Sequence, residues 1–95
     1  MDDQVRQVRV VVANPQGLHA RPADMFVKLA MQFQSTIEVI KDRERVDGKS
    51  ILSILTLAAG QGEELQIEAK GPDAEEAVRA LEEQISKNFA DDYEI

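Results

Sequence analysis

The 95-residue chain has no cysteine and a single histidine. The lack of cysteine excludes disulfides, thiolate metal ligands and cysteine nucleophiles. One imidazole is too few for an ordinary zinc site. Aromatic residues make up only 4% of the chain, so its core has to be built from Val, Ile, Leu and Ala. We therefore expect no metal and no cofactor.

Basic residues are also scarce, since 11 Lys and Arg face 18 Asp and Glu, for a net charge of -7. An acidic chain is a poor match for nucleic acid or an anionic membrane. No apolar run approaches the ~20 residues that span a bilayer, and "MDDQVRQVRV" lacks the apolar segment of a signal peptide. We expect a cytoplasmic monomer with no membrane insertion. Its single domain spans residues 1–95, with a core at about 4–89 and an acidic tail at 90–95.

The spacing of apolar residues switches between the periods of strands and helices. It predicts strands at 4–12, 36–40 and 64–69, a short strand ending at Asp47, and helices at 20–33, 50–60 and 74–89. The run "KDRER" (41–45) is predicted to be a hairpin connection, and Ser50 and Asp73 are expected N-caps. The order β-α-β-β-α-β-α predicts an α+β fold, a four-stranded antiparallel sheet with three helices on one face.

The stretch "GLHARPA" (17–23) places the histidine, His19, at the predicted start of the first helix. A helix N-terminus binds phosphate through unpaired N–H groups and its dipole. A neutral imidazole nitrogen is nucleophilic, and the guanidinium of Arg21 suits phosphate oxygens. Gly17 permits a tight turn, and Pro22 is tolerated in a first helical turn. These residues favour a site that accepts a phosphoryl group, although a histidine near a turn is often a surface residue without a function.

Two segments of the sequence resemble signatures of one family. "NPQGLHARPA" resembles the active-site signature of HPr, the histidine-containing phosphocarrier of the phosphoenolpyruvate-dependent sugar phosphotransferase system. "DGKSILSILTLAA" resembles the signature around that family's regulatory serine, and His19 and Ser50 lie 31 residues apart, as in the family. The resemblance covers about residues 4–89 and implies an HPr-like open-faced β-sandwich.

The resemblance also implies roles for single residues. His19 would accept a phosphoryl group on Nδ1 from phosphorylated enzyme I, and Arg21 would neutralise the phosphoryl oxygens. The backbone amides of Ala20 and Arg21 would face the phosphate. The group would then pass to IIA components, so the chain would be a stoichiometric carrier rather than an enzyme.

The second signature implies regulation and docking. Ser50 is either a plain N-cap or the target of an HPr kinase/phosphorylase, and Leu52 and Leu55 are expected to dock partners. Two features depart from the family pattern: Asp24 stands where a small or neutral residue is usual, and Ala58-Ala59 replace a glycine. We assign Asp24 to partner binding, with Lys28, four residues on, as an alternative ion-pair partner.

Two other functions remain open. The chain could be a purely regulatory interaction protein of an incomplete phosphotransferase system, acting through Ser50. It could also be a small-molecule-binding domain, such as an amino-acid sensor of similar element order, which would leave the His-Ala-Arg-Pro junction unexplained. An enzyme with its own turnover is disfavoured, because no base accompanies a nucleophile.

Overall fold

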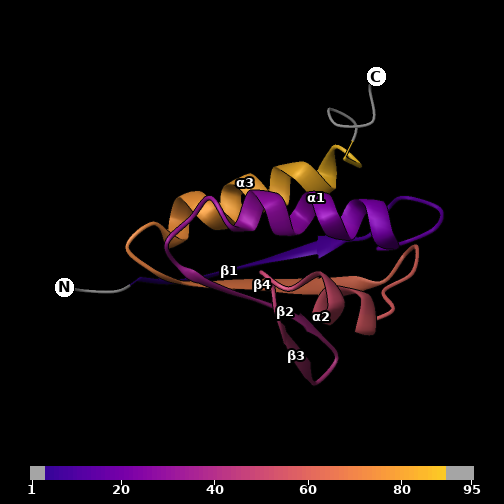
Figure 1. The fold of residues 1–95 in the computed structure, drawn as a ribbon, viewed down its shortest axis with the longest axis horizontal. Coiled ribbons are helices and arrows are strands. Elements are labelled where there is room, and N and C mark those ends of the chain that lie inside the picture. The colour runs from indigo at the N-terminus through magenta and orange to yellow at the C-terminus, as the bar shows by residue number, and fades with distance from the viewer. Residues whose placement is uncertain (1–3, 90–95) are drawn as a thin grey trace.

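A computed structural model describes residues 4–89; the predicted acidic tail at 90–95 lies outside the described residues. The elements follow in the predicted order (Figure 1). They are β1 (Gln4–Val11), α1 (Ala20–Ala30), β2 (Thr36–Lys41), β3 (Glu44–Asp47), α2 (Ile51–Thr56), β4 (Glu64–Gly71) and α3 (Ala74–Ser86).

The four strands form one antiparallel sheet in the order β1-β4-β2-β3. Strand β4 is central, so Ile67 pairs with Val8 on one side and Val39 on the other. Alternate residues of these strands face one side of the sheet, where Val10, Leu65 and Ile67 are buried. The antiparallel sheet that the period-two pattern predicted is confirmed.

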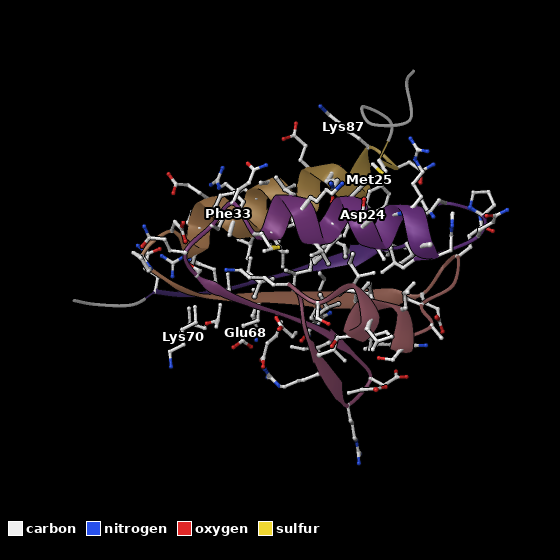
Figure 2. The ribbon with its side chains drawn as sticks, viewed as in Figure 1. Asp24, Met25, Phe33, Glu68, Lys70 and Lys87 are labelled. Carbon is white, nitrogen blue, oxygen red and sulfur yellow. The ribbon has the colours of Figure 1, made fainter. Side chains whose placement is uncertain are left out.

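The helices bury one face of this sheet. In Figure 1, α1 and α3 lie side by side along it. The short helix α2 contacts α1 and adds Ile54 and Leu57 to the same core. The apolar residues at helical spacing in α3 and just after it are all buried: Ala74, Ala77, Val78, Leu81, Ile85 and Phe89. The opposite face is polar, and Figure 2 shows Glu68 and Lys70 pointing away from the helices. The α+β architecture with an open face is therefore confirmed.

The predicted hairpin connection between the second and third strands is confirmed, but it is shorter than residues 41–45. Strand β2 continues to Lys41 and β3 begins at Glu44, so only Asp42 and Arg43 form the turn. Asp42 has φ 57, which suits the tight two-residue loop of a hairpin. The charged run misled the prediction because β3 is an edge strand, where charged side chains are common.

Most predicted ends lay one to four residues too far along the chain, whereas the second and the last strands were predicted too short. The three helices end at Ala30, Thr56 and Ser86 rather than at 33, 60 and 89, and β4 continues to Gly71 rather than to 69. The residues after each helix form turns whose apolar side chains, such as Phe89, still pack on the core. Apolar spacing therefore continues past the last helical hydrogen bond.

Asp73 occupies the N-cap position of α3, as predicted, but its side chain does not cap that helix. Its carboxylate accepts hydrogen bonds from the backbone N–H of Gln34 and of Ser35 (both 2.9 Å) and from the Ser35 hydroxyl (2.6 Å). The hydroxyl bond, foremost, and the backbone bonds lower the pKa of Asp73. The start of α3 is thus tied to the chain that follows α1.

Between residues 4 and 89, every helix is too short or too polar to cross a lipid bilayer.

Candidate phosphoryl-acceptor site

His19 is the N-cap residue of α1, as the sequence predicted. Its backbone is extended (φ -85, ψ -166), and its side chain makes no capping hydrogen bond. The residue is half-buried. The imidazole therefore lies at the helix start and does not cap the helix.

A tight turn delivers the chain to this position. The N–H of Gly17 donates to the carbonyl of Asn14 (3.0 Å), and Gly17 has φ 71. A Cβ at Gly17 would lie 2.3 Å from the carbonyl oxygen of Ala59. Leu18 then donates its N–H to that same oxygen (2.9 Å). Only glycine fits here, so the approach to His19 is fixed by close backbone contact with the chain after α2.

Asn14 is a residue of the site that sequence reasoning missed. It is 4% exposed, and its Nδ2 donates to the carbonyl of Gly17. Its Oδ1 is buried without a hydrogen-bond partner among the described residues. The signal in the sequence was its place at the first position of an Asn-Pro-x-Gly turn, where Asn is favoured.

The first turn of α1 is suited to an anion. Its first residues are Ala20, Arg21 and Pro22, and no acidic residue lies in that turn. The first N–H groups of a helix have no partner within the helix and lie at the positive end of its dipole. Pro22, which has no N–H, is buried at this start. An anion beside His19 would therefore meet the backbone N–H groups of Ala20 and Arg21.

Arg21 and Asp24 face a groove between α1 and α3. The groove has a volume of about 740 Å³ and is also lined by Met25, Lys28 and Lys87. Figure 2 shows Asp24 and Met25 on α1 and Lys87 beyond the end of α3. Asp24 forms the expected ion pair with Lys28 (3.1 Å). This pairing offsets the negative charge that Asp24 places one helical turn from His19.

Ser50 is the N-cap of α2, and its hydroxyl accepts a hydrogen bond from the N–H of Ser53 (3.2 Å). The N-cap prediction is confirmed. Lys49, just before it, donates from Nζ to the carbonyl of Phe33 (2.8 Å), beyond the end of α1. The chain after the other end of α2 reaches Ala59, whose carbonyl accepts the N–H of Leu18. Ser50 thus lies at the start of α2, whereas the residue before His19 contacts the turn after its end.

The exposed surface of α2 is apolar. Leu52 is 72% and Ile51 39% exposed, whereas Leu55 is half-buried against the core. Ile54 and Leu57 are buried. Leu52 is therefore the most exposed large apolar side chain of the described residues, and Leu55 is exposed only in part.

No metal centre is built into residues 4–89, where no group of three or more His, Cys, Asp or Glu side chains is placed to hold an ion. What the site offers is a nucleophilic ring nitrogen, a guanidinium and the N–H groups of a helix start. The fold and these groups define a small α+β protein equipped to carry a phosphoryl group.

Comparison with known proteins identifies the family. The model of the family described as "PTS HPr component phosphorylation site" matches residues 6–87. The phosphocarrier protein HPr of Treponema pallidum is 40% identical over 88 residues, which cover 93% of this chain and 98% of that protein. The chain belongs to the HPr family of phosphocarriers of the phosphotransferase system.

Solved structures agree with this assignment. The crystal structure of HPr-C-His from Thermoanaerobacter tengcongensis matches with a TM-score of 0.87 and 42% identity, covering 90% of this chain and 96% of that one. The solution structure of Crh, the Bacillus subtilis catabolite repression HPr, matches with a TM-score of 0.64 and 38% identity over 84% of this chain and 95% of that one. The predicted fold and the predicted role as a carrier rather than a catalyst are confirmed.

Proposed function

We propose that His19 accepts the phosphoryl group from phosphorylated enzyme I and passes it to IIA components of the sugar phosphotransferase system. In the accepting step the lone pair of Nδ1 attacks phosphorus, a P–N bond forms, and the bond between phosphorus and the donor breaks. The second transfer reverses these roles toward the IIA component. The observation that carries the proposal is the placement of His19 at the start of α1, with no side-chain cap and no acid in the first turn.

The surrounding groups have separate roles in this proposal. Arg21 compensates the charge of the phosphoryl oxygens, and the N–H groups of Ala20 and Arg21 donate to them. The turn at Gly17 and the buried Pro22 hold the imidazole in place beside these donors. Leu52, Leu55 and Asp24 contact the partner proteins from the neighbouring surface.

Phosphorylation of Ser50 would modulate the transfer. A phosphate there would add about -1.5 to -2 charge at the start of α2, on the element that carries Leu52. Like-charge repulsion would then weaken docking of enzyme I. A Ser50→Asp variant should therefore accept phosphate more slowly than wild type, and an unchanged rate would contradict this role.

Intact-mass spectrometry after incubation with phosphoenolpyruvate and enzyme I tests the carrier function. We expect one added phosphoryl group that is lost on acid treatment and absent from His19→Ala. Because His19 is the single histidine of the chain, an acid-labile phosphoryl adduct identifies it as the acceptor.

A second function is favoured by the 38% identity to Crh, whose name describes it as a catabolite repression HPr. In that case the chain would be a regulatory protein that acts through phosphorylated Ser50. No adduct on wild type with an active enzyme I would favour it, particularly if an HPr kinase/phosphorylase modified Ser50.

A further inference from the structure

Lys41 is a charged residue on the inner side of the sheet. It is the last residue of β2 and shares its face with Ile37 and Val39, which are buried. Its side chain is only 21% exposed. Nζ donates to the carbonyls of Leu57 (3.0 Å) and Ala58 (3.4 Å) and forms an ion pair with Oε1 of Glu63 (3.2 Å). An ammonium that is partly withdrawn from water is stabilised by such partners.

The two carbonyls belong to the end of α2, which lacks the usual glycine. Leu57 is the C-cap, and Ala58 follows it with φ 52, in the left-handed region. Helices commonly end with glycine in this conformation because a Cβ is strained there. A cation at the last carbonyls stabilises a helix end through the dipole. Lys41 therefore supports a turn that the sequence of α2 alone does not favour.

Glu63 fixes the other side of the same turn. Its Oε1 accepts the N–H of Gly60 (2.7 Å), and its carbonyl accepts the N–H of Val12 (3.0 Å). The bond from the Gly60 N–H, foremost, and then that from Lys41 lower the pKa of Glu63. Lys41 thus bonds to residues 57 and 58 of this turn, and Glu63 bonds to residue 60 and to Lys41.

Residues 57–60 in turn hold the approach to His19. The carbonyl of Ala59 accepts the N–H of Leu18 (2.9 Å), and Gly17 packs directly against Ala59 and Gly60. Figure 1 shows the loop before α1 and the loop after α2 at the same end of the molecule. A shift of the turn after α2 would therefore move the residue that precedes the imidazole.

We propose that Lys41 and Glu63 are positioning residues for phosphoryl transfer, which act through residues 57–60 to set the place of His19. The inference rests on the proposed function of His19 as the acceptor. A displacement of a reacting group by about 1 Å can reduce a rate ~100-fold. We expect Lys41 and Glu63 to affect the transfer step rather than docking, because the proposed docking residue Leu52 lies on the exposed side of α2.

The test combines kinetics with amide hydrogen exchange on Lys41→Met, which keeps the aliphatic stem and removes the charge. With enzyme I and phosphoenolpyruvate, we expect kcat to fall roughly 3–10-fold, with KM for the carrier within about twofold of wild type. In the unphosphorylated protein, the Leu18 N–H should exchange roughly tenfold faster, while the N–H of Ile67 in the central strand keeps its protection. Glu63→Gln should change both readouts in the same direction, and Lys41→Arg should restore them.

Arg79→Met is the matched control, since it breaks an ion pair with Glu75 (2.7 Å) on α3 and should leave both readouts unchanged. Unchanged kcat and Leu18 exchange in Lys41→Met would overturn the proposal, as would an equal loss of protection at Leu18 and Ile67. If wild type accepts no phosphoryl group, the proposed function fails, and the role of Lys41 and Glu63 in transfer fails with it. Leu18 exchange then still shows whether these two residues fix the loop before His19.

Discussion

The two long helices begin in electrostatically opposite ways. At the start of α3, Asp73 is the N-cap residue, and Glu75 and Glu76 lie in the first turn. At the start of α1, the N-cap is His19, with no side-chain capping bond, and the first turn contains Arg21 and no acid. The chain thus compensates the positive end of one helix dipole with its own carboxylates and places no acid at the other, as the proposed binding of a phosphoryl group there requires.

The uncompensated start of α1 requires support from packing. Ala23, Phe26 and Ala30 bury its inner face in the core, and Pro22 presets the first turn. Loss of a favourable charge at a helix start costs about 0.3–1 kcal/mol, which is small beside the burial of one large apolar side chain at about 1.5–3 kcal/mol. Acidic side chains therefore stabilise the first turn of α3, whereas α1 depends on its buried face and has no acid in its first turn.

The largest expected effect comes from the turn before α1. Gly17→Ala would combine a left-handed alanine with a Cβ 2.3 Å from the Ala59 carbonyl oxygen. We expect a loss of roughly 2–4 kcal/mol in the free energy of unfolding, measured by urea denaturation, and slower phosphorylation of His19. Gly62→Ala is the control, since Gly62 also has positive φ (88) but its Cβ would meet no atom within 4 Å. It should lose only about 1–2 kcal/mol, and equal losses at the two glycines would contradict the role of the contact with Ala59.

The next effect concerns the start of α3. Asp73→Asn removes the charge that accepts three hydrogen bonds from Gln34 and Ser35, and we expect a loss of roughly 1–3 kcal/mol at neutral pH. Because the pKa of Asp73 is lowered in the folded state, its contribution is complete above the ordinary pKa of an aspartate. This stabilising contribution is lost as the pH falls through the pKa of Asp73 in the folded state. The stability difference between wild type and variant should therefore shrink in urea denaturation at acid pH, and Glu76→Gln serves as the control.

These two sites also show how far the sequence could lead. Apolar periodicity was sufficient for the sheet, the three helices and the core residues of α3, and the junction around His19 was visible as a pattern of residue types. The partners of Asp73 and Lys41 were not predictable, because each lies far along the chain and is brought near only by the packed fold. A local N-cap rule places Asp73 correctly but assigns its carboxylate to the wrong N–H groups.

An acid placed in the first turn of α1, as in α3, should stabilise the fold but slow the phosphorylation of His19. In Ala20→Glu the new carboxylate lies on an exposed residue of the first turn. We expect the free energy of unfolding to rise by about 0.3–1 kcal/mol, because the dipole is compensated. The rate of phosphorylation by enzyme I should fall roughly 3–30-fold, since the carboxylate occupies the place of the anion. A rate equal to that of wild type would refute the assignment of this helix start as the phosphoryl site.

The smallest expected effect refines the same comparison within α1. Asp24 is the acid within α1, and its ion pair with Lys28 (3.1 Å) lies on an exposed helix surface. Asp24→Asn should lower the free energy of unfolding by only about 0.2–0.5 kcal/mol, as for other pairs at this spacing. It should also raise the rate of phosphorylation by up to about twofold, because a negative charge one turn from His19 is removed. Lys28→Gln breaks the same pair and leaves the carboxylate unpaired, so it should slow phosphorylation instead. Opposite changes in rate at equal loss of stability would show that the charge of Asp24 acts on His19, and rates that fall together would show that the contact of Asp24 with enzyme I outweighs this effect.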